Sequence, residues 1–112
     1  MQGFLTTHVL DTARGIPSRG IVVELYRDGQ LLGRKTTNDD GRTDGPILAA
    51  EDFALGDYVL LFKAGDYLDG DGGRAGSTFL KDIPIHFTMD QDQHYHVPLL
   101  LSGYGYSTYR GS

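Results

Sequence analysis

Two histidines are the residues of this sequence best suited to acid–base chemistry. His8 lies in the run LTTHVLD and His96 in the run HYHVPLLLS. Both runs predict strands, whose successive side chains point to opposite faces. Because Val9 and Val97 would then point into a core, both histidines are expected on the outer face. A neutral imidazole can accept a proton near pH 7, so the pair predicts either a base with an orienting partner or two ordinary polar strand residues.

A second imidazole accompanies His96 on its strand. His94 stands two residues earlier and shares the same face, and such a pair could hold zinc or copper. No Asp or Glu stands at a ligand-like spacing nearby, and the sequence contains no cysteine. Acid–base chemistry is therefore favoured over a metal site, and a metal-binding β-domain is the weaker alternative.

Arg42 is a cation whose surroundings could also serve chemistry. It follows Asp39-Asp40-Gly41 in a turn-rich segment, and a guanidinium there could bind a carbonyl or stabilise a developing oxyanion. An exposed ion pair with Asp39, Asp40 or Asp44 is the competing interpretation. From the residues alone, the ion pair is favoured.

The last four residues, Tyr109 to Ser112, are unusual for the end of a chain. Chain ends usually fray, but this segment continues directly from a β-rich run. Ser112 would bring its hydroxyl together with the terminal carboxylate to one point. The segment therefore predicts either a disordered tail or a polar end that reaches a site.

Seven or eight short β-rich runs must position these groups. Glycines, 16 of the 112 residues, and turn signals such as Asp28-Gly29 separate them, a spacing typical of an antiparallel β-sandwich. A brief helix is expected at Ala49–Leu55 and a loop at Asp66–Thr78, where glycines interrupt any apolar period. The expected strands are Leu5–Leu10, Gly20–Arg27, Gln30–Thr37, Arg42–Asp44, Asp57–Lys63, Ile83–Met89, His94–Ser102 and Tyr104–Tyr109.

The run from His94 has two faces that are both partly apolar. Pro98 and Leu100 share the face of the histidines, although neither suits open solvent. Apolar residues on both sides of an antiparallel strand indicate that the outer side is also covered. This face therefore predicts a subunit interface or a ligand channel. The opposite face, which predicts the core, carries Tyr95, Val97, Leu99 and Leu101.

Composition and charge limit the possible classes of protein. A chain of 112 residues predicts one domain, residues 1–112. Its net charge is −5 and its basic residues are not clustered, which argues against a nucleic-acid partner. The sequence contains no run of about 18 apolar residues, so no membrane-spanning helix is expected. The start shows no charged-then-apolar leader, so a soluble cytoplasmic protein is expected.

Four stretches together resemble the 5-hydroxyisourate hydrolases, the enzyme branch of the transthyretin-like family. They are LTTHVLD with the following GIP, GRTDG around Arg42, HYHVPLLLS around His96, and the ending YGYSTYRGS. The stretches occur in the family's order over nearly the whole chain. The final YRGS is the signature that separates the hydrolases from the hormone carriers.

The resemblance implies an all-β fold, a two-sheet sandwich of about eight strands with one short helix. It implies a homotetramer, in which two edge-to-edge dimers stack around a channel. It also implies hydrolysis of a purine-derived cyclic amide, 5-hydroxyisourate, with no metal or organic cofactor and no nucleic-acid or membrane partner. Carried over by matching position, the catalytic residues would be His8, Arg42, His96 and Ser112, and the substrate-binding residues would be Pro98, Tyr109, Arg110 and Gly111.

Three points complete these expectations. The family commonly has a helix within Asp66–Thr78, and the glycines there predict a shorter or melted one. The resemblance leaves a periplasmic or peroxisomal location open as an alternative to the cytoplasm. The main functional alternative is a carrier that binds a small ligand in the channel without chemistry, against which His8, His96 and the YRGS ending argue. A generic β-sandwich interaction module is a further alternative.

Overall fold

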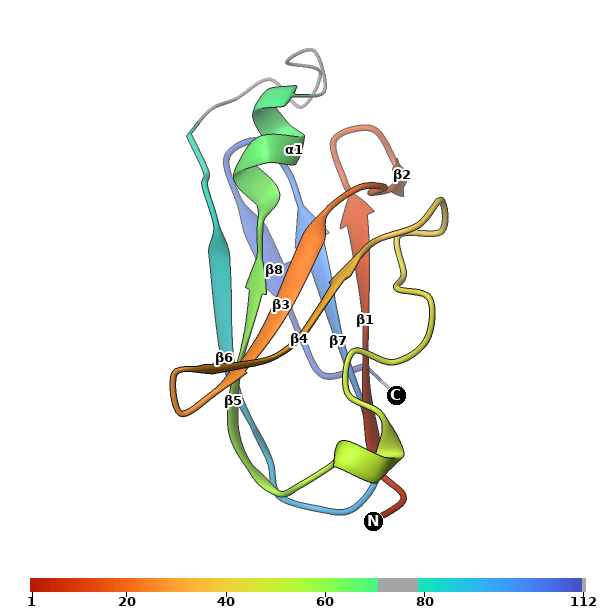
Figure 1. Cartoon of the computed structure of the whole chain (residues 1–112). Helices are drawn as coiled ribbons and strands as arrows, with labels where there is room; N and C mark the ends of the chain where they lie inside the picture. Colours follow the sequence, from red (N-terminus) through yellow and green to blue (C-terminus); the bar gives the residue numbers. More distant parts are fainter. Residues whose placement is uncertain (71–78, 112) are drawn as a thin grey trace.

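The chain folds as two four-stranded sheets packed face to face (Figure 1). The computed structural model describes residues 1–70 and 79–111. The strand order is β2-β1-β7-β8 in one sheet and β4-β3-β5-β6 in the other. This architecture confirms the predicted β-sandwich. The strands are β1 (Phe4–Asp11), β2 (Ile16–Pro17), β3 (Val22–Arg27), β4 (Gln30–Thr36), β5 (Gly56–Phe62), β6 (Ile83–Met89), β7 (His94–Leu101) and β8 (Tyr106–Thr108).

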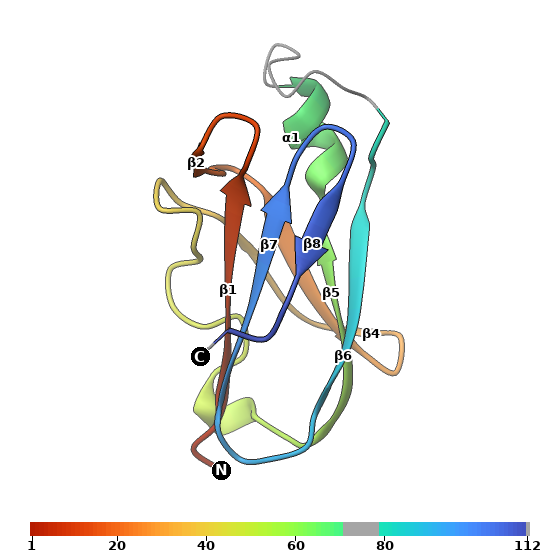
Figure 2. The ribbon, with the colours of Figure 1, turned by 180° about the vertical axis from the view of Figure 1, so that it is seen from behind.

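Strands β1 and β7 pair in parallel, in contrast to the other strand pairs of the two sheets. The pairs β1–β2, β3–β4, β3–β5, β5–β6 and β7–β8 are all antiparallel. By contrast β1 and β7 run in the same direction over eight residue pairs, from Phe4 opposite His94 to Asp11 opposite Leu101. Figure 2 shows these two strands side by side at the centre of their sheet. This pairing brings together the two histidine-bearing segments of the sequence.

The core lies between the sheets and follows the predicted alternation. In β1 the buried residues alternate with half-buried ones, and Leu5 and Val9 are fully buried. In β7 Tyr95, Val97 and Leu99 point inward in the same way. Burying such side chains contributes about 1.5–3 kcal/mol each. The outward-facing sets of both strands are therefore held on one rigid surface.

Two short elements differ from the sequence-based expectations. The expected strand at Arg42–Asp44 does not form, because Arg42 makes a single isolated bridge to His8 and the loop around it bonds to itself through Asn38. The expected helix at Ala49–Leu55 shrinks to one turn of 3₁₀-helix at Ala50–Asp52, and none of its three residues is buried.

A helix also occupies part of the expected loop at Asp66–Thr78. Helix α1 (Ala64–Gly70) follows β5, and Ala64 and Leu68 bury one of its faces in the core. Residues four apart lie on the same face of a helix, so Ala64 and Leu68 pack against the core together. Residues 71–78 of the expected loop lie outside the described residues. Within residues 1–70 and 79–111, no helix has the length and apolar character needed to cross a membrane.

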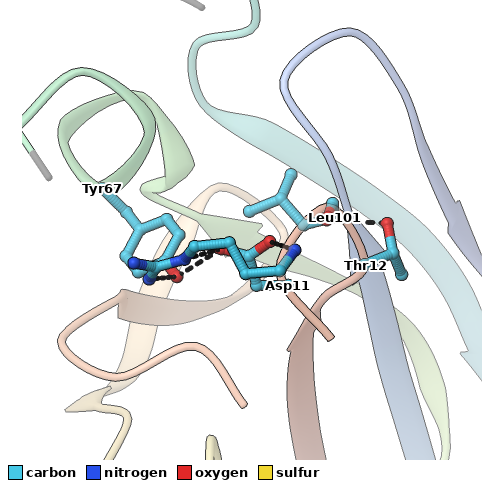
Figure 3. A network of polar contacts seen from close by, with 5 residues as sticks. Asp11, Thr12, Tyr67 and Leu101 are labelled. Atoms are coloured by element: carbon cyan, nitrogen blue, oxygen red, sulfur yellow. Dashed lines mark hydrogen bonds and ion pairs between the residues drawn. The ribbon is translucent and has the colours of Figure 1, made fainter. Parts of the chain in front are cut away.

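A buried carboxylate ties the end of β1 to helix α1 (Figure 3). Asp11 accepts hydrogen bonds from the hydroxyl of Tyr67 at 2.7 Å and from the Nε and backbone amide of Arg14 at 3.1 and 3.0 Å. The hydroxyl of Thr12 next to it donates to the carbonyl of Leu101 at 3.1 Å. These bonds hold β1, β7 and α1 in a fixed relation at one end of the sandwich.

Candidate active site

The register of β1 and β7 places His8 and His96 on the same outer surface. In this parallel pair His96 stands opposite Thr6, and His8 opposite Pro98. Both imidazoles are half-buried on the face that does not form the core, as the alternation predicted. Their ring centroids are 6.4 Å apart with planes tilted by 37°. A small molecule between or beside the rings could therefore contact both.

Arg42 reaches this surface from the loop that follows β4. The amide of Val9 donates to the carbonyl of Gly41 at 2.8 Å, which anchors the loop along β1. Gly41 has φ of +74°, a conformation that costs glycine little. Arg42 then forms an isolated bridge with His8. This backbone pairing sets the guanidinium at the rim of the same surface.

The competing ion pair at Arg42 is not what the structure contains. Asp39 instead pairs with Arg19, Nε to Oδ1, at 3.0 Å. Asp44 accepts a hydrogen bond from the side chain of Asn38 at 2.8 Å. Within the described part of the chain, Arg42 has no carboxylate within 4 Å of its guanidinium. Its charge is therefore directed to the cleft.

The last described residues return to β7 and border the same surface. Thr108 pairs with Leu99, and Gly111 pairs with His96 in the continuing register. The amide of Gly111 donates to the carbonyl of His96 at 2.7 Å. Figure 2 shows the chain leaving β8 and crossing β7 toward β1. Because strand residues alternate, Tyr109 and Gly111 face the cleft, and Arg110 faces away from it.

These segments enclose an open cleft of about 570 Å³. Its volume falls within the roughly 300–1,000 Å³ typical of small-molecule sites. Five of the residues expected in the site are brought together there, and six further residues complete the wall. The cleft is lined by His8, Arg42, His96, Tyr109 and Gly111 from the expected set, and by Thr6, Thr7, Thr43, Gly45, Pro46 and His94.

Two of the expected site residues that the structure describes lie away from the cleft. Pro98 is buried and does not line the cleft. Arg110 places its guanidinium carbon 4.2 Å from the ring centroid of Tyr95 and donates to Oε1 of Gln93 at 2.5 Å. It therefore anchors the terminal segment rather than lining the cleft. Ser112 lies outside the described residues, and its role stays a prediction.

The pKa values of His8 and His96 are both lowered, which favours the neutral form of these two imidazoles. Burial lowers the pKa of His8, and the nearby charge of Arg42 lowers it further, partly offset by Asp40. Burial likewise lowers the pKa of His96, with added repulsion from Arg42, His8 and His94. A base must be deprotonated to work, so a lowered pKa keeps it competent at and below neutral pH.

Thr6 is the site residue that sequence reasoning missed. Its Oγ1 lies 2.7 Å from Nε2 of His94 and 2.8 Å from Nδ1 of His96. The alternation of β1 already placed Thr6 on the face of His8. The register of β1 against β7, which sets Thr6 opposite His96, has no local signal in the sequence.

The weaker metal interpretation of His94 and His96 finds no third ligand. Their ring centroids are 6.3 Å apart, and one nitrogen of each ring is engaged by Thr6. Within residues 1–70 and 79–111, no group of three or more His, Cys, Asp or Glu side chains could surround an ion. These residues therefore offer hydrogen-bond chemistry rather than a coordination sphere.

The chain is similar in sequence and structure to known proteins over almost its whole length. Residues 5–111 match the model of the HIUase/transthyretin family. The chain is 54% identical to the 5-hydroxyisourate hydrolase of Mesorhizobium japonicum over 98% of this chain and 93% of that protein. The structure of Klebsiella pneumoniae 5-hydroxyisourate hydrolase superposes with a TM-score of 0.85 at 35% identity, covering 100% and 95% of the two chains. The structure of an (S)-allantoin synthase superposes with a TM-score of 0.88 at 43% identity, and the chain spans 44% of that longer protein.

Proposed function

The chain belongs to the HIUase/transthyretin family, and we propose that it hydrolyses 5-hydroxyisourate to 2-oxo-4-hydroxy-4-carboxy-5-ureidoimidazoline in the breakdown of urate. The relatives of matching length that carry this name span almost the entire chain. The single observation that supports the assignment within the structure is the shared cleft of His8, His96 and Arg42. A neutral imidazole can act as a general base toward water, and a guanidinium can stabilise the oxyanion that forms when water attacks a cyclic amide.

The proposed reaction adds water across a carbon–nitrogen bond of the ring. An imidazole of the His8–His96 pair accepts a proton from water as its oxygen attacks the amide carbonyl. Arg42 stabilises the negative charge that forms on the carbonyl oxygen. The imidazolium then returns the proton to the departing ring nitrogen, the bond breaks, and the former carbonyl becomes the carboxylate of the product. Tyr109, which also lines the cleft, is proposed to hydrogen-bond the substrate ring.

The test follows the decay of freshly made 5-hydroxyisourate, generated in place by urate oxidase acting on urate. Its absorbance is compared in buffer, with the wild-type protein, and with His96→Ala and Arg42→Ala. Arg19→Ala is the control for Arg42→Ala, because Arg19 is an exposed arginine that pairs with Asp39 and does not line the cleft. We expect the His96 and Arg42 variants to lose about 10²–10⁴-fold in rate and the control to match the wild type. A wild-type decay equal to that in buffer would refute the hydrolase and favour a carrier.

The sheet edges support a proposed assembly through β6 and β8. Both are edge strands, and residues of both line one groove at the same side of the sandwich. Edge strands present unpaired backbone groups, so each could pair with its copy in a second chain. We propose that such dimers stack into a tetramer. Light scattering should then give four times the chain mass of 12.3 kDa, and a monomer mass would contradict the proposal.

A further inference from the structure

Thr6 places one hydroxyl between two imidazoles. Its Oγ1 is within hydrogen-bond distance of Nδ1 of His96 and Nε2 of His94 at once. We propose that His96, Thr6 and His94 form a proton relay that fixes which ring nitrogen of His96 carries the proton. The inference rests on the proposed hydrolase function, and it adds Thr6 and His94 as positioning residues that act through His96.

The relay follows from the parallel register of two strands. Thr6 stands opposite His96, and Phe4 opposite His94, so the three polar side chains share the outer face. The ring of His94 stacks on Phe4 with centroids 4.1 Å apart and planes within 8°. That stack and the backbone bond from Gly111 to His96 hold the two imidazoles on either side of the hydroxyl. Main-chain pairing and the ring stack on Phe4 thus set the geometry together.

A threonine hydroxyl has one hydrogen, so it can donate to only one of the two rings. In the first order, Nδ1–H of His96 donates to Oγ1, and the hydroxyl donates to Nε2 of His94. His96 then keeps a lone pair on Nε2, which makes it a base. In the reverse order, His94 donates to Oγ1 and the hydroxyl donates to Nδ1 of His96. Nε2 of His96 would then carry a proton and could only donate.

The surroundings favour the first order during water attack. His96 is half-buried and lies near the charge of Arg42, whereas His94 is exposed to solvent. When Nε2 of His96 takes a proton from water, Nδ1 can pass its own proton to Oγ1 as the hydroxyl proton moves to Nε2 of His94. His96 and Thr6 each gain one proton and lose one, whereas His94 only gains one, so the positive charge ends on the solvated ring of His94. Charge there costs less than beside the guanidinium of Arg42.

The first test separates the Thr6 hydroxyl from the Thr6 shape. Thr6→Val removes the hydroxyl at nearly constant volume, and Thr6→Ser keeps it. We expect Thr6→Val to lower kcat about 10-fold or more with a smaller change in KM, because a base in the wrong tautomer is inactive. Thr6→Ser should recover most of the rate. Thr12→Val, which removes a hydroxyl bonded to the carbonyl of Leu101 outside the cleft, is the matched control.

The second test examines His94 together with Thr6. His94→Phe keeps a ring to stack on Phe4 and removes the nitrogen that accepts from Thr6. We expect a loss in kcat similar to that of Thr6→Val. The double variant should be little worse than either single variant, since groups of one relay are not additive. Losses that multiply in the double variant would overturn the relay.

A direct readout does not depend on turnover. Nitrogen-15 shifts of the histidine rings distinguish the two neutral tautomers, and the His96 signals are assigned by their loss in His96→Asn. We expect a proton on Nδ1 of His96 in the wild type and in Thr6→Ser, and a mixed population in Thr6→Val. The same tautomer in all three, or equal kcat losses for Val and Ser, would overturn the inference. Failure of the wild type to accelerate the decay would refute the proposed function alone, and the tautomer measurement would still test the relay.

Discussion

The amide of Gly111 donates to the carbonyl oxygen of His96 over 2.7 Å, so the end of the chain is fastened to the strand that carries a proposed base. The same glycine packs against the imidazole itself. A Cβ built on Gly111 would stand 2.6 Å from Cδ2 of the His96 ring. Only a residue without a side chain can approach the ring so closely, and the identity of residue 111 is therefore a requirement of the cleft.

Gly111→Ala should impair catalysis more than folding. The added methyl group would push either the His96 ring or the terminal segment out of place, and a small displacement of a base is costly for rate. We expect the rate of 5-hydroxyisourate hydrolysis to fall by about 10-fold or more, with little change in the denaturation midpoint. Gly105→Ala is the matched control, since its Cβ would meet only the Ser102 hydroxyl at 3.9 Å. Equal activity of the two variants would contradict the packing argument.

The alternating strands show how far the fold could be predicted from the sequence. The buried sets of β1 and β7 follow from a period of two, and this local signal was sufficient. Helix α1 had no signal in the apolar pattern, although the resemblance implied a shortened helix in this region. Among its residues whose burial is described, Ala64 and Leu68 are the buried ones. The strand expected at Arg42 was wrong because Asn38 bonds the backbone amides of Asp40 and Arg42, which closes the loop on itself.

Some features of the site could be predicted from a single strand, whereas others depend on how two distant strands pair. The outer-face positions of His8 and His96 could be inferred from their own strands. The bridge from Thr6 to His96 could not, because it joins residues 90 positions apart through a register that neither strand specifies alone. Arg110 was expected to bind substrate from its position in the YRGS ending. In the structure its guanidinium contacts Tyr95 and Gln93, and its role in substrate binding stays a prediction.

Arg42 affects the cleft by charge and by shape, and two substitutions separate these effects. Its charge lowers the pKa of both His8 and His96, after the larger effect of burial. Arg42→Gln removes the charge, so both pKa values should rise. Because the base acts when deprotonated, the acid limb of kcat/KM should move to higher pH. Arg42→Lys keeps the charge and should leave the limb in place, although it loses the planar fork that binds a carbonyl oxygen.

The rate profile of both variants is measured from about pH 5 to 9, the range in which histidine titrates, after subtraction of spontaneous decay. We expect both to turn over about 10²–10³-fold more slowly than the wild type. Only Arg42→Gln should show the displaced limb. If the acid limb of kcat/KM stayed at the same pH in Arg42→Gln, the charge of Arg42 would not affect the pKa of the base.

We expect Arg110 to position the terminal segment that borders the cleft. Its guanidinium lies over the ring of Tyr95 and bonds Gln93, which fixes the segment that presents Tyr109 to the cleft. Arg110→Gln should therefore raise KM several-fold and leave the pH of the acid limb unchanged, since no charge in the cleft is altered. Arg19→Gln removes an exposed arginine from an ion pair with Asp39 outside the cleft and serves as the control. A shifted acid limb in Arg110→Gln would show that this residue acts on the bases after all.

Tyr67 should control how strongly acid destabilises the fold. Burial by itself would raise the pKa of Asp11, but hydrogen bonds from Tyr67 and Arg14 outweigh it and hold the pKa below its usual value. A carboxyl with a lowered folded-state pKa stabilises the protein above its unfolded pKa of about 3.9. That contribution is lost as the pH falls through the folded-state value.

Tyr67→Phe removes one of these donors and also an acceptor of the Arg14 guanidinium. We expect the free energy of unfolding to fall by about 1–2 kcal/mol at pH 7. The folded-state pKa of Asp11 should rise toward the unfolded value, so the variant should lose less stability on acidification and its curve should approach that of the wild type. Urea denaturation from neutral pH to below about pH 3.9 measures both curves. Tyr106→Phe, at an exposed position on β8, should follow the wild type throughout, and a constant gap between Tyr67→Phe and the wild type would show that the hydroxyl does not act through the ionisation of Asp11.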